Sequence, residues 1–181
     1  MALEIVIEFP MSLGLAYHVA HHHRGHEVLQ VLDAAERAGI TAALQRLQHD
    51  GGYCLDPSGH GYQRGHLQTQ VTRHTTSEDT LRPPHAHVLI ASHTPDGAQV
   101  HLPAVARAAT SAQHAAVAAL AHALIDDGIG VETARTPAGR ELVAFAQHAR
   151  QLPRVMNCPP VQPGVQQVRP LDRYDTTAST A

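Results

Sequence analysis

The sequence has no tryptophan and no lysine, only two cysteines, and an aromatic content of 3%. Cys54 and Cys158 lie too far apart to match the spacing of a zinc or redox pair, which argues against a disulfide-stabilised scaffold and favours a reducing compartment. No stretch approaches 18 uninterrupted apolar residues, and the N-terminus lacks the pattern of a signal peptide. These absences predict a soluble, cytoplasmic protein with no membrane partner.

The charge balance restricts the function further. All 13 basic residues are arginine, 16 residues are acidic, and the formal net charge is −3. General electrostatic binding to nucleic acid needs a basic surface, so any contact with DNA has to be local. The length of 181 residues suits one domain with a substantial core.

Strand and helix patterns alternate along the first 150 residues. Period-2 alternation and turn residues predict strands at residues 3–9, 66–74 and 85–92, with another short strand after the turn at 95–97. Helical spacing of apolar residues predicts helices at 12–23, 25–50 and 110–128. We expect Ser12 and either Thr110 or Ser111 to cap their helices, and residues 53–65 to form a loop.

The chain changes character at about Gln151. Residues 151–181 are rich in proline and show little periodicity, which is typical of disordered segments. We therefore expect two regions, a folded domain at 1–150 and a disordered tail at 151–181.

Histidine is the abundant residue, with 16 copies. The stretch "HTTSEDTLRPPHAHVLIAS", residues 74–92, contains His74, His85 and His87. A chain this rich in histidine produces roughly one or two His-x-His pairs by chance, and a second pair does occur at His21 and His23. The spacing of His85 and His87 alone therefore does not indicate a metal site, and the neighbouring sequence has to decide.

The geometry of the predicted strands indicates how the three histidines are placed relative to one another. Residues two apart on a strand face the same side, so His85 and His87 share one face. If the strands at 66–74 and 85–92 pair as an antiparallel hairpin, His74 lies beside them, and three imidazoles converge with coordination positions left open. Such a set suits Mn²⁺, Co²⁺, Ni²⁺ and Zn²⁺ better than Ca²⁺. The alternative is that these are surface histidines of a histidine-rich chain.

The motifs around this stretch resemble those of a known family. In order, the sequence has a histidine, a Thr-Ser loop, Pro-Pro-His-x-His, an aliphatic run, an Asp-Gly turn and an alanine-rich helix, with "EIVIEFPMS" before them. In this order, residues 4–145 resemble the relaxase domain of the TrwC/TraI type, the MobF class of conjugative relaxases within the HUH endonucleases. Glu4 stands where the family has an aspartate, and Met11 stands where it has a lysine.

The resemblance implies an α+β fold with a central antiparallel sheet and helices packed on one face. It implies a divalent metal ion of the Mg²⁺, Mn²⁺ or Zn²⁺ class held by His74, His85 and His87, and a carboxylate, Glu4, that orients one of these histidines. It further implies single-stranded DNA as the partner. In such enzymes the ion polarises the scissile phosphate and a tyrosine attacks it during plasmid transfer.

One part of the family pattern is not matched. The nucleophilic tyrosine of these relaxases lies in a segment before the strand that begins near Glu4, so we expect a domain truncated at its N-terminus, with a separate chain as one source of the missing segment. None of the tyrosines stands at the nucleophile's position: Tyr17, Tyr53, Tyr62 and Tyr174.

Four functions therefore stay open. They are a relaxase-like domain that is incomplete or inactive alone, a non-catalytic remnant that binds metal or DNA, a metal-dependent hydrolase that uses bound water, and a histidine-rich metal-storage protein. Arg64, Arg73 and Arg82 flank the predicted site as candidates for phosphate contact or as solvated surface residues. The segment at 21–26 is predicted to be an exposed helix end and not a metal site.

Overall fold

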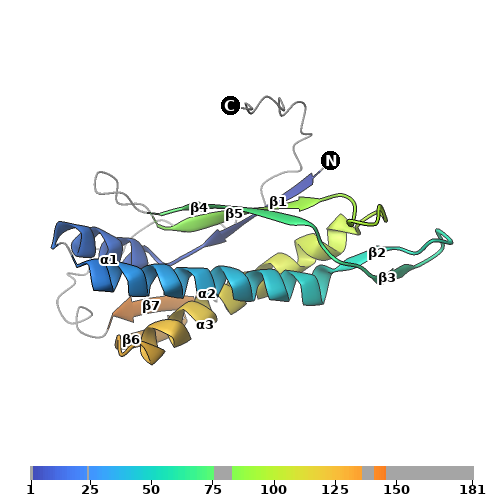
Figure 1. Cartoon of the computed structure of the whole chain (residues 1–181). Coiled ribbons are helices and arrows are strands. Elements are labelled where there is room, and N and C mark those ends of the chain that lie inside the picture. Colours follow the sequence, from blue (N-terminus) through green and yellow to red (C-terminus); the bar gives the residue numbers. More distant parts are fainter. Residues whose placement is uncertain (1, 24, 76–82, 136–140, 146–181) are drawn as a thin grey trace, which may run out of the picture.

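The computed structural model of the chain describes residues 2–23, 25–75, 83–135 and 141–145. Three layers are stacked in this part of the chain: a three-stranded sheet, a layer of helices, and a pair of short strands on the far side of the helices (Figure 1). The tail predicted at 151–181 lies outside the described residues.

The three-stranded sheet consists of β1 (Ala2–Glu8), β5 (His85–Ala91) and β4 (Thr69–His74), in the order β1-β5-β4 with both pairs antiparallel. The predicted strands are confirmed, although β4 begins three residues later than expected. Alternation sorts their side chains onto two faces. The inner face is apolar and at most 7% exposed in β1 and β5: Leu3, Ile5, Ile7, Ala86, Val88 and Ile90.

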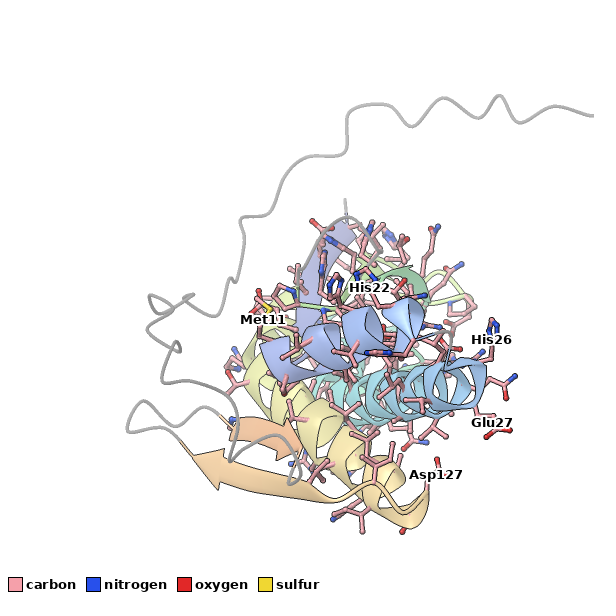
Figure 2. All side chains as sticks on the ribbon, turned by 90° about the vertical axis from the view of Figure 1, so that its left-hand side faces the viewer. Met11, His22, His26, Glu27 and Asp127 are labelled. Atoms are coloured by element: carbon pink, nitrogen blue, oxygen red, sulfur yellow. The ribbon has the colours of Figure 1, made fainter. Side chains whose placement is uncertain are left out.

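Helices cover the inner face of this sheet. They are α1 (Met11–His22), α2 (His26–Gly51) and α3 (Leu102–Asp126). Figure 2 looks along the layers, with α1 in front between its labelled ends Met11 and His22, and with the sheet on one side of the helices. One cluster of buried side chains joins the sheet to all three helices. The predicted α+β fold, with helices packed on one face of an antiparallel sheet, is confirmed.

Helices α2 and α3 approach each other closely because small residues line their contact. A Cβ atom added at Gly39 would lie 2.8 Å from the Ala116 carbonyl oxygen and 2.8 Å from a ring carbon of Phe9. At Gly51 it would lie 2.7 Å from the Cα atom of Val105. These two glycines are therefore required by helix packing, in the middle and at the end of α2.

Two predicted helix starts are wrong. Helix α1 begins at Met11 directly after Pro10, so Ser12 lies inside the helix and is not its N-cap. Helix α3 begins at Leu102, eight residues before the predicted cap, with a proline in its first turn. Ser111 lies inside α3, where its hydroxyl donates to Asp50 Oδ2 of α2 at 2.8 Å. The local sequence around a serine does not show whether its hydroxyl caps a helix or bonds to a neighbouring helix.

Two short strand pairs complete the fold. Residues predicted as a loop form a hairpin of β2 (Tyr53–Leu55) and β3 (Tyr62–Arg64). Strands of only three residues are too short to show a period-2 alternation in the sequence. The second pair is β6 (Val131–Arg135) with β7 (Glu141–Phe145), beside α3. The strand predicted after the 95–97 turn is reduced to isolated bridges at Gln99 and Val100.

The predicted end of α3 is confirmed. Gly128 adopts a φ of +79°, and the Ile129 N–H closes the helix by donating to the Leu124 carbonyl oxygen at 2.8 Å. None of the helices in the described residues has an apolar stretch long enough to cross a membrane.

Candidate metal centre

The sheet register brings the three predicted histidines together. His74 pairs with His85 across β4 and β5, and Thr72 pairs with His87. Paired residues of an antiparallel sheet face the same side, so all three imidazoles stand on the outer face, opposite the helices. They lie at the end of the sheet where β4 finishes and β5 begins (Figure 1).

The three rings are close enough for their nitrogens to share one ion. One nitrogen from each ring lies within 4.8 Å of the other two. The ring centroids are separated by 5.0 Å for His74 and His85, 5.1 Å for His74 and His87, and 5.2 Å for His85 and His87. His74 is exposed and the other two are partly exposed, so the group is open on the solvent side.

Two hydrogen bonds orient the rings of β5. The Nδ1–H of His87 donates to Glu4 Oε1 at 2.7 Å, and the Nδ1–H of His85 donates to the Pro83 carbonyl oxygen at 3.1 Å. A neutral imidazole that donates through Nδ1 carries its lone pair on Nε2. When the rings are neutral, these two hydrogen bonds therefore leave Nε2 of each ring available to a metal ion.

Glu4 reaches His87 from the neighbouring strand. Its partner across the sheet is Leu89, and Val6 is the partner of His87, so the carboxylate and the ring are diagonal neighbours on one face. Such diagonal pairs are within reach of long side chains. The structure thus places the carboxylate of Glu4 in contact with one of the three histidines, His87.

Two of the three predicted arginines fall within the described residues, and neither has its side chain at this site. Arg73 faces the helices and pairs with Asp33 and Glu36 of α2. Arg64 stacks over the Tyr53 ring at 4.3 Å in the β2-β3 hairpin, at the other end of the sheet (Figure 1). The prediction that they flank the site is therefore wrong for both, and Arg82 lies outside the described residues.

The described tyrosines also lie away from the histidines. Tyr17 is buried in α1, where its hydroxyl donates to Glu36 Oε2 at 2.9 Å. Burial, followed by the nearby Glu36 carboxylate, raises the pKa of Tyr17 well above its ordinary value. Tyr53 and Tyr62 belong to the hairpin whose Cys54 bridges Val100, and Val100 bonds to Ser92 just beyond the end of β5 opposite to the histidines. Tyr174 lies outside the described residues.

The histidine-rich turn between α1 and α2 forms no comparable group. The rings of His18 and His22 meet edge to face at 4.5 Å. Among the described residues, His74, His85 and His87 form the one group of three or more histidine, cysteine or acidic side chains that could hold an ion. The structure thus distinguishes these three from the other histidines within the described residues.

Sequence reasoning missed a polar cluster behind the site, made of Tyr17, Asp33, Glu36 and Arg73. A signal for it was present in the sequence. Glu36 lies four residues from both Leu32 and Ile40, on the apolar side of α2, where a carboxylate needs a buried partner.

No family model matches the sequence, and no curated protein matches it. Solved structures do match. A metal-bound structure of the conjugative relaxase TrwC in complex with oriT DNA has 19% sequence identity and a TM-score of 0.62, and covers 79% of this chain. A copper-bound TrwC complex with oriT DNA has 18% identity, a TM-score of 0.61 and 77% coverage.

A third match is TrwC with a 27-mer DNA comprising the recognition hairpin and the cleavage site, at 18% identity, a TM-score of 0.59 and 79% coverage. The chain spans about half the length of these structures, 47% to 49%. Identity at this level carries information about the fold alone. Across most of its length, this chain therefore has the fold of the conjugative relaxase TrwC.

Proposed function

We propose that this chain is a relaxase-like domain that holds a divalent metal ion through His74, His85 and His87 and uses it to bind a phosphate of single-stranded DNA. The observation that carries the proposal is the convergence of the three rings, with nitrogens within 4.8 Å of one another, on an open sheet face of a TrwC-like fold. The proposed unit is residues 1–150, without the tail at 151–181.

The donor set fits a divalent ion. Three neutral imidazoles with room for further ligands are typical of ion sites that remain accessible to substrate. The hydrogen bonds to Glu4 and to the Pro83 carbonyl oxygen fix two of the rings with Nε2 available, as the partners behind metal-bound imidazoles do. Nitrogen ligands favour Mn²⁺ and Zn²⁺, while Mg²⁺ usually prefers oxygen.

The histidines and Glu4 have separate tasks in this proposal. The three rings hold the ion on the outer face, and Glu4 keeps His87 in the correct tautomer. A bound ion would supply the positive charge that polarises a phosphate group. The solved TrwC structures contain oriT DNA, which makes single-stranded DNA the substrate class to test for this chain.

We propose nicking of single-stranded DNA in conjugative transfer as the reaction to which this site is related. A second candidate is binding of metal or DNA without cleavage. The positions of Tyr17, Tyr53 and Tyr62, buried or at the far end of the sheet, favour this candidate for the described residues taken alone. The two differ in whether a covalent tyrosine–DNA adduct forms.

Calorimetry with Mn²⁺ and Zn²⁺ tests the metal site. The wild type is compared with a variant carrying His74→Ala, His85→Ala and His87→Ala, and with a control carrying His21→Ala, His22→Ala and His23→Ala. Both variants keep 13 of the 16 histidines, so composition is matched. We expect one tight site in the wild type and the control, and its loss in the first variant.

Equal and weak binding in all three proteins would contradict the proposal and favour metal storage by many histidines. If the site is present, binding to a mixed-sequence single-stranded oligonucleotide is measured with and without the metal. Denaturing electrophoresis then distinguishes the reactions: an adduct indicates nicking by tyrosine, free ends indicate hydrolysis by water, and unchanged DNA indicates binding without cleavage.

A further inference from the structure

A cluster of charged and polar side chains lies on the inner face of the sheet, directly behind His74. Arg73 donates through Nε to Glu36 Oε1 at 3.3 Å and through Nη2 to Glu36 Oε2 at 3.2 Å, and Nη2 also donates to Asp33. Tyr17 donates to the same Glu36 carboxylate. The cluster therefore ties β4 to both α1 and α2.

The position of Arg73 makes this tie strong. Its partner across the sheet is Ala86, which in turn pairs with Ile7, and both of these residues are completely buried. Glu36 is also completely buried. A buried carboxylate has to be paired, and the planar guanidinium meets it with two parallel hydrogen bonds, which restrict distance and angle at once.

The strand that carries His74 needs such a tie more than the strand that carries the other two histidines. β5 has a neighbouring strand on each side, whereas β4 is at the edge of the three-stranded sheet in the described residues. His74 is also the last residue of β4. Strand ends open more easily than strand centres, and metal ligands have to be held within about 0.5 Å of their working positions.

We propose that Arg73 is a positioning residue of the metal centre: bound to Glu36 and Asp33 of α2, it fixes the end of β4 so that His74 completes the group with His85 and His87. Neighbouring residues of a strand face opposite sides, so Arg73 fixes the backbone from the inner face while His74 faces solvent. This inference rests on the proposed function for the ligand role of His74. The tie between β4 and α2 does not depend on it.

Hydrogen exchange in the metal-free full chain tests the tie itself. Arg73→Met removes the guanidinium and keeps much of the side-chain length, but leaves Glu36 without its charged partner. The double variant Arg73→Met/Glu36→Gln removes that charge as well, so it keeps the test usable if the single variant does not fold. We expect faster exchange at residues 69–75 in both variants, with the amides of residues 86, 88 and 90, which face β1 in the sheet, unchanged.

Metal affinity tests the consequence for the site. Loss of residues that support metal ligands commonly lowers affinity by about 10- to 100-fold. We expect Arg73→Met/Glu36→Gln to lower Mn²⁺ affinity by about tenfold or more. Arg73→Lys keeps the charge without the two parallel bonds, so we expect an intermediate loss. With Co²⁺ as the probe, the visible spectrum is expected to show a site with one imidazole fewer.

Two controls separate positioning from general destabilisation. Arg37 also pairs with Asp33, but its side chain is 62% exposed, so Arg37→Gln removes the same charge without touching β4. Leu124→Ala destabilises the core at the far end of α3, where Leu124 is completely buried. We expect both to leave metal affinity within about twofold of the wild type, since neither contacts the site.

The outcomes are distinct. Unchanged exchange at residues 69–75 in the double variant would overturn the proposal, and so would an equal loss of affinity in Leu124→Ala. If the wild type binds no metal while exchange at residues 69–75 still rises in the variants, the proposed function has failed and the tie between β4 and α2 stands. If exchange rises and affinity falls together, Arg73 positions His74.

Discussion

At the scale of single residues, two glutamates of β1 differ in one contact. Glu4 and Glu8 both face the outer side of the sheet, and both are exposed. Glu4 accepts the Nδ1–H of His87, whereas the backbone of Glu8 is bonded to the side chain of Gln113. Glu8 lies directly opposite His85 across the sheet, but among the described contacts its carboxylate has no hydrogen bond to a ring, so it offers a control for the charge of Glu4 close to the site.

Glu4→Gln is expected to lower the metal affinity of the wild type by about tenfold, because an amide is a weaker acceptor and no longer raises the basicity of His87. Glu8→Gln removes the same charge from the same face and is expected to change the affinity by less than threefold. Calorimetry with Mn²⁺ measures both. Equal losses in the two variants would mean that Glu4 acts through its charge alone.

Tyr17 gives a prediction about alkaline pH. Its pKa is raised in the folded chain by burial and by Glu36, so folding favours the neutral phenol. A raised pKa contributes stability that is complete below the unfolded value of 10 and is lost as the pH rises above it. Above pH 10 we expect the free energy of unfolding of the wild type to fall relative to Tyr17→Phe, by up to about 1.4 kcal/mol per pH unit.

Urea unfolding between pH 8 and pH 11 measures this difference for the two proteins. The other tyrosines are present in both, so their titration cancels in the comparison. Parallel curves for wild type and Tyr17→Phe across this range would show that the hydroxyl of Tyr17 is accessible to water in the folded chain.

At the scale of elements, the contact between α2 and α3 sets the distance between the helices that support the sheet. Gly39 has the Ala116 carbonyl oxygen of α3 on one side and the Phe9 ring on the other. A glycine in a helix interior costs about 1 kcal/mol relative to alanine. The close approach of backbone to backbone explains why a glycine stands there.

Gly39→Ala is expected to destabilise the chain by about 1–3 kcal/mol, since its Cβ would lie 2.8 Å from the Ala116 oxygen and the backbone has to move. The control is Ala34→Leu at an exposed position of the same helix, with an expected change within about 0.5 kcal/mol. Urea unfolding compares them. A gain in stability from Gly39→Ala would mean that helix propensity outweighs the contact.

At the scale of the whole molecule, a bound ion would couple the outer face of the sheet to folding. The three proposed ligands come from β4 and β5, whose pairing exists only in the folded chain. A ligand that binds only the folded state raises its stability in proportion to the logarithm of its concentration. The change in folding stability on addition of metal therefore measures binding at this site.

At a metal concentration about 100 times the dissociation constant, we expect a stabilisation of about 2.7 kcal/mol, and a rise in Tm of roughly 5–10 °C for a chain of this length. The variant with all three histidines replaced is expected to show no such rise. Differential scanning calorimetry with increasing Mn²⁺ measures both. A rise of the same size in that variant would place the stabilising ion elsewhere.

Much of the sheet was predictable because its signals are local. Alternation in residues 3–9 and 85–91 places apolar and polar residues on opposite faces whatever the partner strand is, and the order of motifs indicated the fold. The phase of His74, His85 and His87 followed from the same period of two. What local periodicity does not contain is the strand register, which brought His74 opposite His85.

The sequence by itself thus determined the elements of the sheet, the face on which each histidine stands, and the resemblance to relaxases. Tertiary structure decided the remainder. It showed that Arg73 faces α2 and not the site, that Ser111 bonds to Asp50 and does not cap a helix, and that residues 53–64 pair as a hairpin. The physical reason is common to these cases. Each depends on a partner outside the local sequence pattern, and arginine, serine and strands of three residues are compatible with several partners until packing selects one.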